Sequence, residues 1–103
     1  MEFGTRIEHD ELVSVIALEG ELDVTSAPSF RATVFGLIGA GHRRLVIDLS
    51  GLDFIDSSGL WVIVAAHREV DAAGGKLLLR HPRPTALKVL ETTGLSGMIE
   101  IEP

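Results

Sequence analysis

The chain has no cysteine and no tyrosine, and its 103 residues include only one tryptophan and four prolines. Without cysteine it cannot form disulfides, thiolate zinc sites, iron–sulfur clusters or a cysteine nucleophile. No apolar run approaches the roughly 20 residues that a membrane-spanning helix needs. The first residues are polar, so we do not expect them to form a signal peptide. We therefore expect a cytoplasmic domain that does not contact the membrane.

Positive charge is also scarce, with 9 Lys and Arg residues against 15 Asp and Glu residues and a net charge of −6. An acidic surface repels phosphate backbones, so we expect no binding to nucleic acid. The length and the 46% apolar composition fit one globular domain spanning residues 1–103. Residues 1–4 include the Glu-Phe pair that cloning vectors often leave behind, so a vector origin for them stays open.

The negative charge is concentrated near the start of the chain. Residues 1–30 hold seven acidic residues and one basic residue, whereas residues 31–103 are neutral overall. Two interpretations remain open at this stage. The acids either keep a solvated strand edge from aggregating or form an electrostatic surface for a basic partner.

Apolar patterns separated by Gly and Pro predict the element order ββαβαβα, followed by a short strand. We expect strands at 3–9, 12–19, 45–49, 76–79 and 98–101, and helices at 25–39, 57–73 and 85–92. Residues 9–11 are expected to form a hairpin turn and residues 50–56 a loop. Strands that alternate with helices predict an α/β fold. The expected fold is a mixed, mostly parallel sheet of four or five strands with three or four helices packed on it.

Asp56-Ser57-Ser58-Gly59 opens the second predicted helix, directly after a buried strand and a short connection. Loops that follow parallel strands are the usual functional edge of such sheets, and a helix N-terminus stabilises an anion. A phosphoserine at Ser57 would fit this position, and Gly59 is expected to leave room for the phosphate. The alternative is that Asp56 and the serines only cap the helix, because Asp and Ser are favoured N-cap residues.

Four segments of the chain are similar, in the same order, to those of the STAS domains. The resemblance is to the stand-alone bacterial anti-anti-sigma factors, also called anti-sigma factor antagonists. The matching segments are Gly-Glu-Leu-Asp at 20–23, the strand at 45–50, Phe-Ile-Asp-Ser-Ser-Gly-Leu at 54–60, and the late helix with its Gly-Leu stop at 89–95.

This resemblance implies a regulator that switches partners and has no catalytic residues, cofactor or metal. An anti-sigma factor that is itself a serine kinase would phosphorylate Ser57. The unphosphorylated form would bind that kinase and free the sigma factor, and a PP2C-type phosphatase would reset the switch. The residues expected to bind the partner are Asp23, Asp56, Ser57, Ser58, Gly59, Leu60 and Trp61.

Physical arguments support such a switch. A phosphate adds a charge of about −1.5 to −2, and no Lys or Arg lies between Arg44 and Arg68 to neutralise it. Trp61 lies four residues after Ser57, so both share one face of the helix. Trp61 is expected to be partly exposed as a hot spot for the partner, unless it packs under a loop.

Other functions fit the sequence less well. A serine hydrolase would need a base beside the serine, but the four histidines show no paired spacing that would indicate such a base. We expect each histidine to lie at the surface or to have its hydrogen bonds satisfied within the fold. No metal-binding motif and no glycine-rich phosphate loop is present. STAS domains that serve as scaffold subunits of sensory or transport complexes, or that bind nucleotides, stay open as alternatives. The oligomeric state is expected to be a monomer or a weak dimer.

Overall fold

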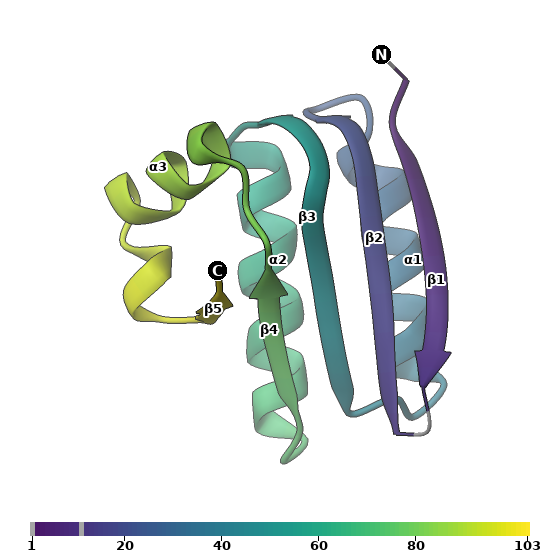
Figure 1. Ribbon diagram of the computed structural model, residues 1–103. Coiled ribbons are helices and arrows are strands. Elements are labelled where there is room, and N and C mark those ends of the chain that lie inside the picture. Colours follow the sequence, from purple (N-terminus) through teal and green to yellow (C-terminus); the bar gives the residue numbers. More distant parts are fainter. Residues whose placement is uncertain (1, 11) are drawn as a thin grey trace.

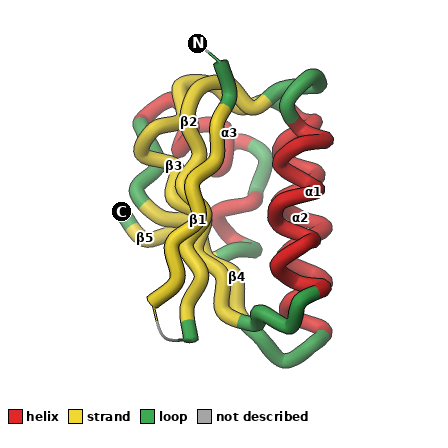
Figure 2. The backbone as a smooth tube through the Cα atoms, turned by 90° about the vertical axis from the view of Figure 1, so that its right-hand side faces the viewer, coloured by secondary structure: helices red, strands yellow, loops and turns green. Residues whose placement is uncertain are grey.

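A computed structural model describes residues 2–10 and 12–103, which form a five-stranded sheet with two helices packed on one face (Figures 1 and 2). The elements, in chain order, are β1 (Gly4–Asp10), β2 (Val13–Leu22), α1 (Ala27–Gly39), β3 (Arg44–Ile55), α2 (Ser57–Ala72), β4 (Lys76–Arg80), α3 (Pro84–Thr92), the 3₁₀ turn η1 (Leu95–Gly97) and β5 (Glu100–Glu102).

The five strands lie side by side in the order of the sequence. β1 pairs with β2 in an antiparallel ladder, and the remaining neighbours are parallel. The connections between parallel strands run through α1, α2 and α3. The predicted α/β class, the mixed sheet and the antiparallel first hairpin are therefore confirmed.

Most of the hydrophobic core lies between the sheet and the layer formed by α1 and α2 (Figure 2), and Ala86 and Leu90 of α3 also belong to it. Every second residue of β2 from Ser14 to Leu18 is buried, as the alternating pattern predicts. The apolar stripes of the two helices face the sheet. Buried residues of these stripes are Phe30, Val34 and Ile38 in α1, and Leu60, Ile63, Val64 and Val70 in α2.

The loop predicted at 50–56 is wrong, because β3 continues to Ile55 and pairs with the end of β2. Two irregularities in the register place extra residues on β3, between the partners of Ala17 and Glu19 and between those of Gly20 and Glu21. The inward-facing residues after Leu49 are consequently Leu52 and Ile55, three residues apart. A strand with such bulges loses its period of two, so its sequence resembles a loop.

The first hairpin also differs from the prediction at both ends. His9 and Asp10 belong to β1, since Asp10 pairs with Val13, and Glu11 of the predicted turn lies outside the described residues. β2 continues through Gly20 to Leu22 instead of ending at residue 19. Gly20 has a φ of +89°, and a Cβ there would lie 2.4 Å from the backbone oxygen of Glu2. Glycine lets the two chain segments approach this closely.

The first residues take part in the fold whatever their origin. Phe3 packs edge-on against Phe30 of α1, with 6.5 Å between the ring centroids. Gly4 is the first residue of β1. Met1 lies outside the described residues.

Candidate functional site at the start of α2

The predicted phosphorylation site opens α2. Asp56 is the N-cap residue, and its carboxylate accepts a hydrogen bond from the backbone N–H of Ser58 at 2.8 Å. Ser57 is the first residue of the 16-residue helix and is exposed. Its hydroxyl makes no hydrogen bond with the described residues, so it is accessible for modification. Capping by Asp56 is thus observed, and Ser57 is not needed for it.

A backbone hydrogen bond joins this helix start to the end of β2. The N–H of Asp56 donates to the carbonyl oxygen of Leu22 at 3.1 Å, and Leu22 pairs with Ile55 in the sheet. Asp23 follows Leu22 and Ser57 follows Asp56, so each of the two residues is one position away from this hydrogen bond. The structure brings the predicted Asp23 to the same edge of the sheet as the segment 56–61.

The carboxylate of Asp23 organises the turn before α1. Its Oδ1 accepts hydrogen bonds from the N–H and hydroxyl of Thr25, at 2.9 and 2.7 Å, and from the N–H of Ser26 at 3.2 Å. The Thr25 hydroxyl, the Thr25 amide and Ser26 hold the pKa of Asp23 below its ordinary value, although desolvation opposes them. Asp23 is therefore a fixed negative charge beside the start of α2.

Gly59 and Leu60 belong to the core and not to the surface. A Cβ on Gly59 would lie 2.4 Å from Cγ of Leu22, which is fully buried. Only 7% of Leu60 is exposed. The expectation that Gly59 leaves room for a phosphate is wrong, because glycine here lets α2 approach β2. Both residues therefore position the helix from within the core.

Three exposed apolar side chains surround the helix start. Trp61 is 68% exposed on α2, Val24 is 70% exposed after β2, and Phe54 is 47% exposed near the end of β3. The prediction that Trp61 is exposed is confirmed, and the alternative that it packs under a loop is wrong. Exposed Trp and Phe side chains are typical of a surface that binds another protein.

Sequence reasoning missed Arg83 at this edge. Arg83 is the N-cap residue of α3, and its guanidinium pairs with Asp53 and donates from Nε to the carbonyl oxygen of Ser50 at 2.6 Å. Arg83 is 30 residues away from Asp53 in the sequence, so the local pattern gave no signal of the contact. A basic residue therefore reaches the β3–α2 edge, although Asp53 already neutralises it.

Among the described residues, no histidine makes a hydrogen bond or ring contact with Asp56 or Ser57. His9 and His42 stack at the amino ends of the parallel strands and share hydrogen bonds with buried Ser14, at 3.0 and 2.9 Å. His81 bonds to the Pro103 carbonyl at 2.9 Å. His67 differs from the expectation, since its Nδ1 is buried without a partner among the described residues. In the described ranges, no three His, Asp or Glu side chains gather as metal ligands would.

Residues 5–103 match the STAS domain family, and the chain therefore belongs to that family. It is 39% identical over 82 residues to the anti-sigma F factor antagonist of Lysinibacillus sphaericus, which covers 79% of this chain and 70% of the relative. An anti-sigma factor antagonist from Mycobacterium paratuberculosis has a similar crystal structure, with a TM-score of 0.91, 26% identity and coverage of 99% and 86%.

The phosphorylated form of the Bacillus cell fate determinant SpoIIAA is similar as well. Its TM-score is 0.77 at 29% identity, and the match covers 97% of this chain and 92% of SpoIIAA. These relatives are bacterial and are named as regulators rather than enzymes. Within residues 2–10 and 12–103, no helix is long and apolar enough to cross a membrane.

Proposed function

We propose that the protein is an anti-sigma factor antagonist controlled by phosphorylation of Ser57. The unphosphorylated form binds an anti-sigma factor that is a serine kinase, and this binding frees a sigma factor. Phosphorylation prevents the binding, and a PP2C-type phosphatase restores it. The observation that carries the proposal is the exposed, unbonded Ser57 at the first position of α2, next to exposed Trp61.

The helix start can carry a phosphate without a change of fold. Asp56 already satisfies one backbone N–H of the first turn, and the remaining N–H groups and the helix dipole stabilise an anion at Ser57. The side chain of Ser57 is exposed, so a phosphate would not displace any core residue. The modification would therefore act at the surface.

Charge gives a reason why the modified form would lose its partner. The phosphate adds about −1.5 to −2 charge beside Asp56 and near Asp23, whose carboxylate is held ionised by its hydrogen bonds. Arg83 does not compensate, since it is paired with Asp53. A partner surface that packs closely on Trp61 would meet both extra charge and extra volume.

Phosphate mapping tests the proposal. The wild-type chain, Ser57→Ala and Ser58→Ala are incubated with candidate anti-sigma factor kinases and ATP, and the modified residue is located by mass spectrometry. We expect one phosphate on the wild-type and Ser58→Ala chains and none on Ser57→Ala. A phosphate on Ser58 in the wild-type chain would contradict the assignment of Ser57.

A further inference from the structure

One face of the sheet carries no helix over β1, β2 and the first half of β3. α1 and α2 both pack on the opposite face (Figures 1 and 2). The side chains that alternate with the core residues therefore face outward, and several of them are apolar and half-buried. We call these residues the open-face patch: Val13, Val15 and Ala17 of β2, Val46 of β3 and Leu78 of β4.

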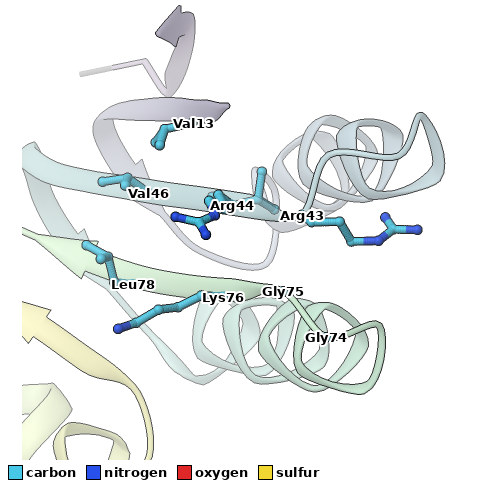
Figure 3. A pocket seen from close by; sticks show the side chains of 9 residues that line it. Val13, Arg43, Arg44, Val46, Gly74, Gly75, Lys76 and Leu78 are labelled. Atoms are coloured by element: carbon cyan, nitrogen blue, oxygen red, sulfur yellow. The ribbon is translucent and has the colours of Figure 1, made fainter. Parts of the chain in front are cut away.

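The patch is contiguous across three strands. Val15, Val46 and Leu78 are direct neighbours in the parallel ladders, and Val13 and Ala17 flank Val15 along β2. Val13, Val46 and Leu78 line a shallow cavity of about 400 Å³ (Figure 3). Parallel strands are normally covered on both faces, so this apolar surface at the middle of the sheet is suited to a covering partner.

Charged residues border the patch, and their signs reverse along the strands. At one end, Asp10 of β1 and Arg44 of β3 lie level with Val13. At the other end, Arg6 of β1 and Asp48 of β3 are both register partners of Ala17. On β1 and on β3, the residues at the two ends of the patch thus carry opposite charges, and on β1 a further acid, Glu8, lies between them opposite Val15.

Arg44 is the bordering residue that most needs a partner. It lies directly opposite Lys76 in the ladder between β3 and β4, which places two like charges side by side. Lys76 pairs with Glu100 at 2.7 Å, whereas no described carboxylate lies within 4.0 Å of Arg44. The guanidinium of the neighbouring Arg43 makes a different contact, because it donates a hydrogen bond to the carbonyl oxygen of Ile38 at the end of α1.

We propose that the open face binds a second copy of the chain, sheet against sheet, about a two-fold axis that crosses the strands. This axis places patch on patch. It brings Arg44 toward the partner's Asp48 and Asp10 toward the partner's Arg6. A face whose charges reverse sign across a central apolar patch is complementary to itself under such an axis. Two approaches join like charges. Lys76 lies toward the partner's Arg80, and both of these residues have a carboxylate of their own. Glu8, the register partner of Val15, lies toward the partner's Glu8, and each Glu8 pairs with Arg6 of its own chain at 3.4 Å.

The dimer does not use the proposed phosphorylation site. Ser57 and Trp61 belong to α2, which packs on the opposite face of the sheet (Figure 2). The two proposals therefore fail or succeed separately. The Ser57→Ala variant, which the phosphorylation mapping uses, is expected to dimerise like the wild type.

Sedimentation equilibrium of the full chain, from micromolar to millimolar concentration, tests the dimer. We expect a reversible monomer–dimer equilibrium for the wild type. Val46→Lys, which buries a charge at the centre of the patch, is expected to weaken it by about 100-fold or more. Met98→Lys is the matched control, since Met98 is 48% exposed beside His67 and Asp71 on the α2 side, and it should not change the dimer.

Reversal of two charges on β1 gives a second test that does not affect the core. Arg6→Asp and Asp10→Arg are each expected to weaken the dimer by about tenfold, and the double variant to restore it, because the pair between the two copies is rebuilt. Circular dichroism confirms folding, and this set decides the question if Val46→Lys fails to fold. A wild type that stays monomeric throughout, or a dimer that Val46→Lys and the charge reversals leave unchanged, would overturn the proposal.

Discussion

At the level of single residues, Gly59 decides how closely α2 approaches β2. A Cβ there would overlap Leu22, which is fully buried and cannot move aside freely. We expect Gly59→Ala to destabilise the fold by about 1–3 kcal/mol, as overpacked cores are. This loss should outweigh the gain of up to about 1 kcal/mol that Ala brings to a helix. Urea unfolding of the variant measures the difference.

Gly36 provides the matched control for this substitution. It lies inside α1 and is exposed, and a Cβ added there would meet no other atom within 4 Å. Gly36→Ala should therefore stabilise the protein by about 0.5–1 kcal/mol. Equal stabilisation by Gly59→Ala would show that the contact with Leu22 does not constrain the helix.

Substitution of Trp61 should weaken the binding of the partner without destabilising the fold. Because 68% of Trp61 is exposed, Trp61→Ala should change the free energy of unfolding by no more than about 0.5 kcal/mol. Its affinity for the cognate kinase should fall by about 2 kcal/mol, the size of a hot-spot contribution. Leu12→Ala, at a residue 79% exposed at the other end of the sheet, is the control in the same titration. Unchanged affinity of a folded Trp61→Ala variant would exclude Trp61 from the interface.

The lowered pKa values of Asp23 and Asp48 make the stability of the fold depend on pH. Hydrogen bonds from Thr25 and Ser26 lower the pKa of Asp23. Burial raises the pKa of Asp48, but hydrogen bonds from Ser50 and Arg80 outweigh it, so that pKa is lowered too. Carboxyls with a depressed folded-state pKa stabilise the protein above their unfolded value and lose this contribution as the pH falls.

Stability should consequently be constant near neutral pH and decrease below about pH 4, the range where unfolded aspartate titrates. Asp23→Asn should make this decrease shallower, because the variant has one fewer carboxyl to protonate. Thermal unfolding between pH 2.5 and 7 measures both slopes. An unchanged slope in Asp23→Asn would mean that the bonds from Thr25 and Ser26 do not favour the ionised form.

At the level of secondary structure, the N-cap of α2 joins fold and function. Asp56→Ala removes the acceptor for the Ser58 N–H and should cost about 0.5–2 kcal/mol. Asp56→Asn keeps an acceptor and should lie within a few tenths of the wild type, since Asn caps helices about as well as Asp. Chemical denaturation of the three proteins compares them. A loss in Asp56→Asn equal to that in Asp56→Ala would indicate that charge, and not the cap, matters here.

The same elements show which parts of the fold follow from local sequence. Continuous apolar runs predicted the first half of β3, and the Asp-Ser opening predicted the first residue of α2. The second half of β3 was missed, since the bulges place Leu52 and Ile55 inward at a spacing of three. That spacing is set by pairing with β2, which the sequence of β3 alone does not contain.

The parts of the candidate site that lie in one segment could be predicted from the sequence, whereas the contacts between segments could not. Ser57, Asp56 and Trp61 lie in one continuous segment, so their mutual placement follows from helical geometry. Arg83 comes from a different segment and reaches Asp53 only through tertiary packing. The local sequence suggests that Gly59 leaves room for a phosphate. Its actual neighbour, Leu22, belongs to β2 and cannot be identified from the sequence around Gly59.

At the level of the whole molecule, the net charge of −6 has a definite location. The excess acids lie in the segment that forms β1, β2 and the turn before α1. Some of them are paired there, as Glu8 and Glu19 are with Arg6 at 3.4 and 3.9 Å. Asp23, at the far end of this segment, lies at the same edge as Ser57, and phosphorylation would make that edge more acidic.

Titration of the cognate anti-sigma factor kinase with the two forms of the protein is the most direct test of the switch. Isothermal calorimetry compares the unphosphorylated chain with the chain phosphorylated on Ser57, and Ser57→Asp is measured alongside them. We expect saturable binding of the unphosphorylated chain, and a loss of at least about 100-fold in affinity for the other two, because added charge at a closely packed interface costs several kcal/mol. Equal affinity of the phosphorylated and unphosphorylated chains would contradict the proposed switch.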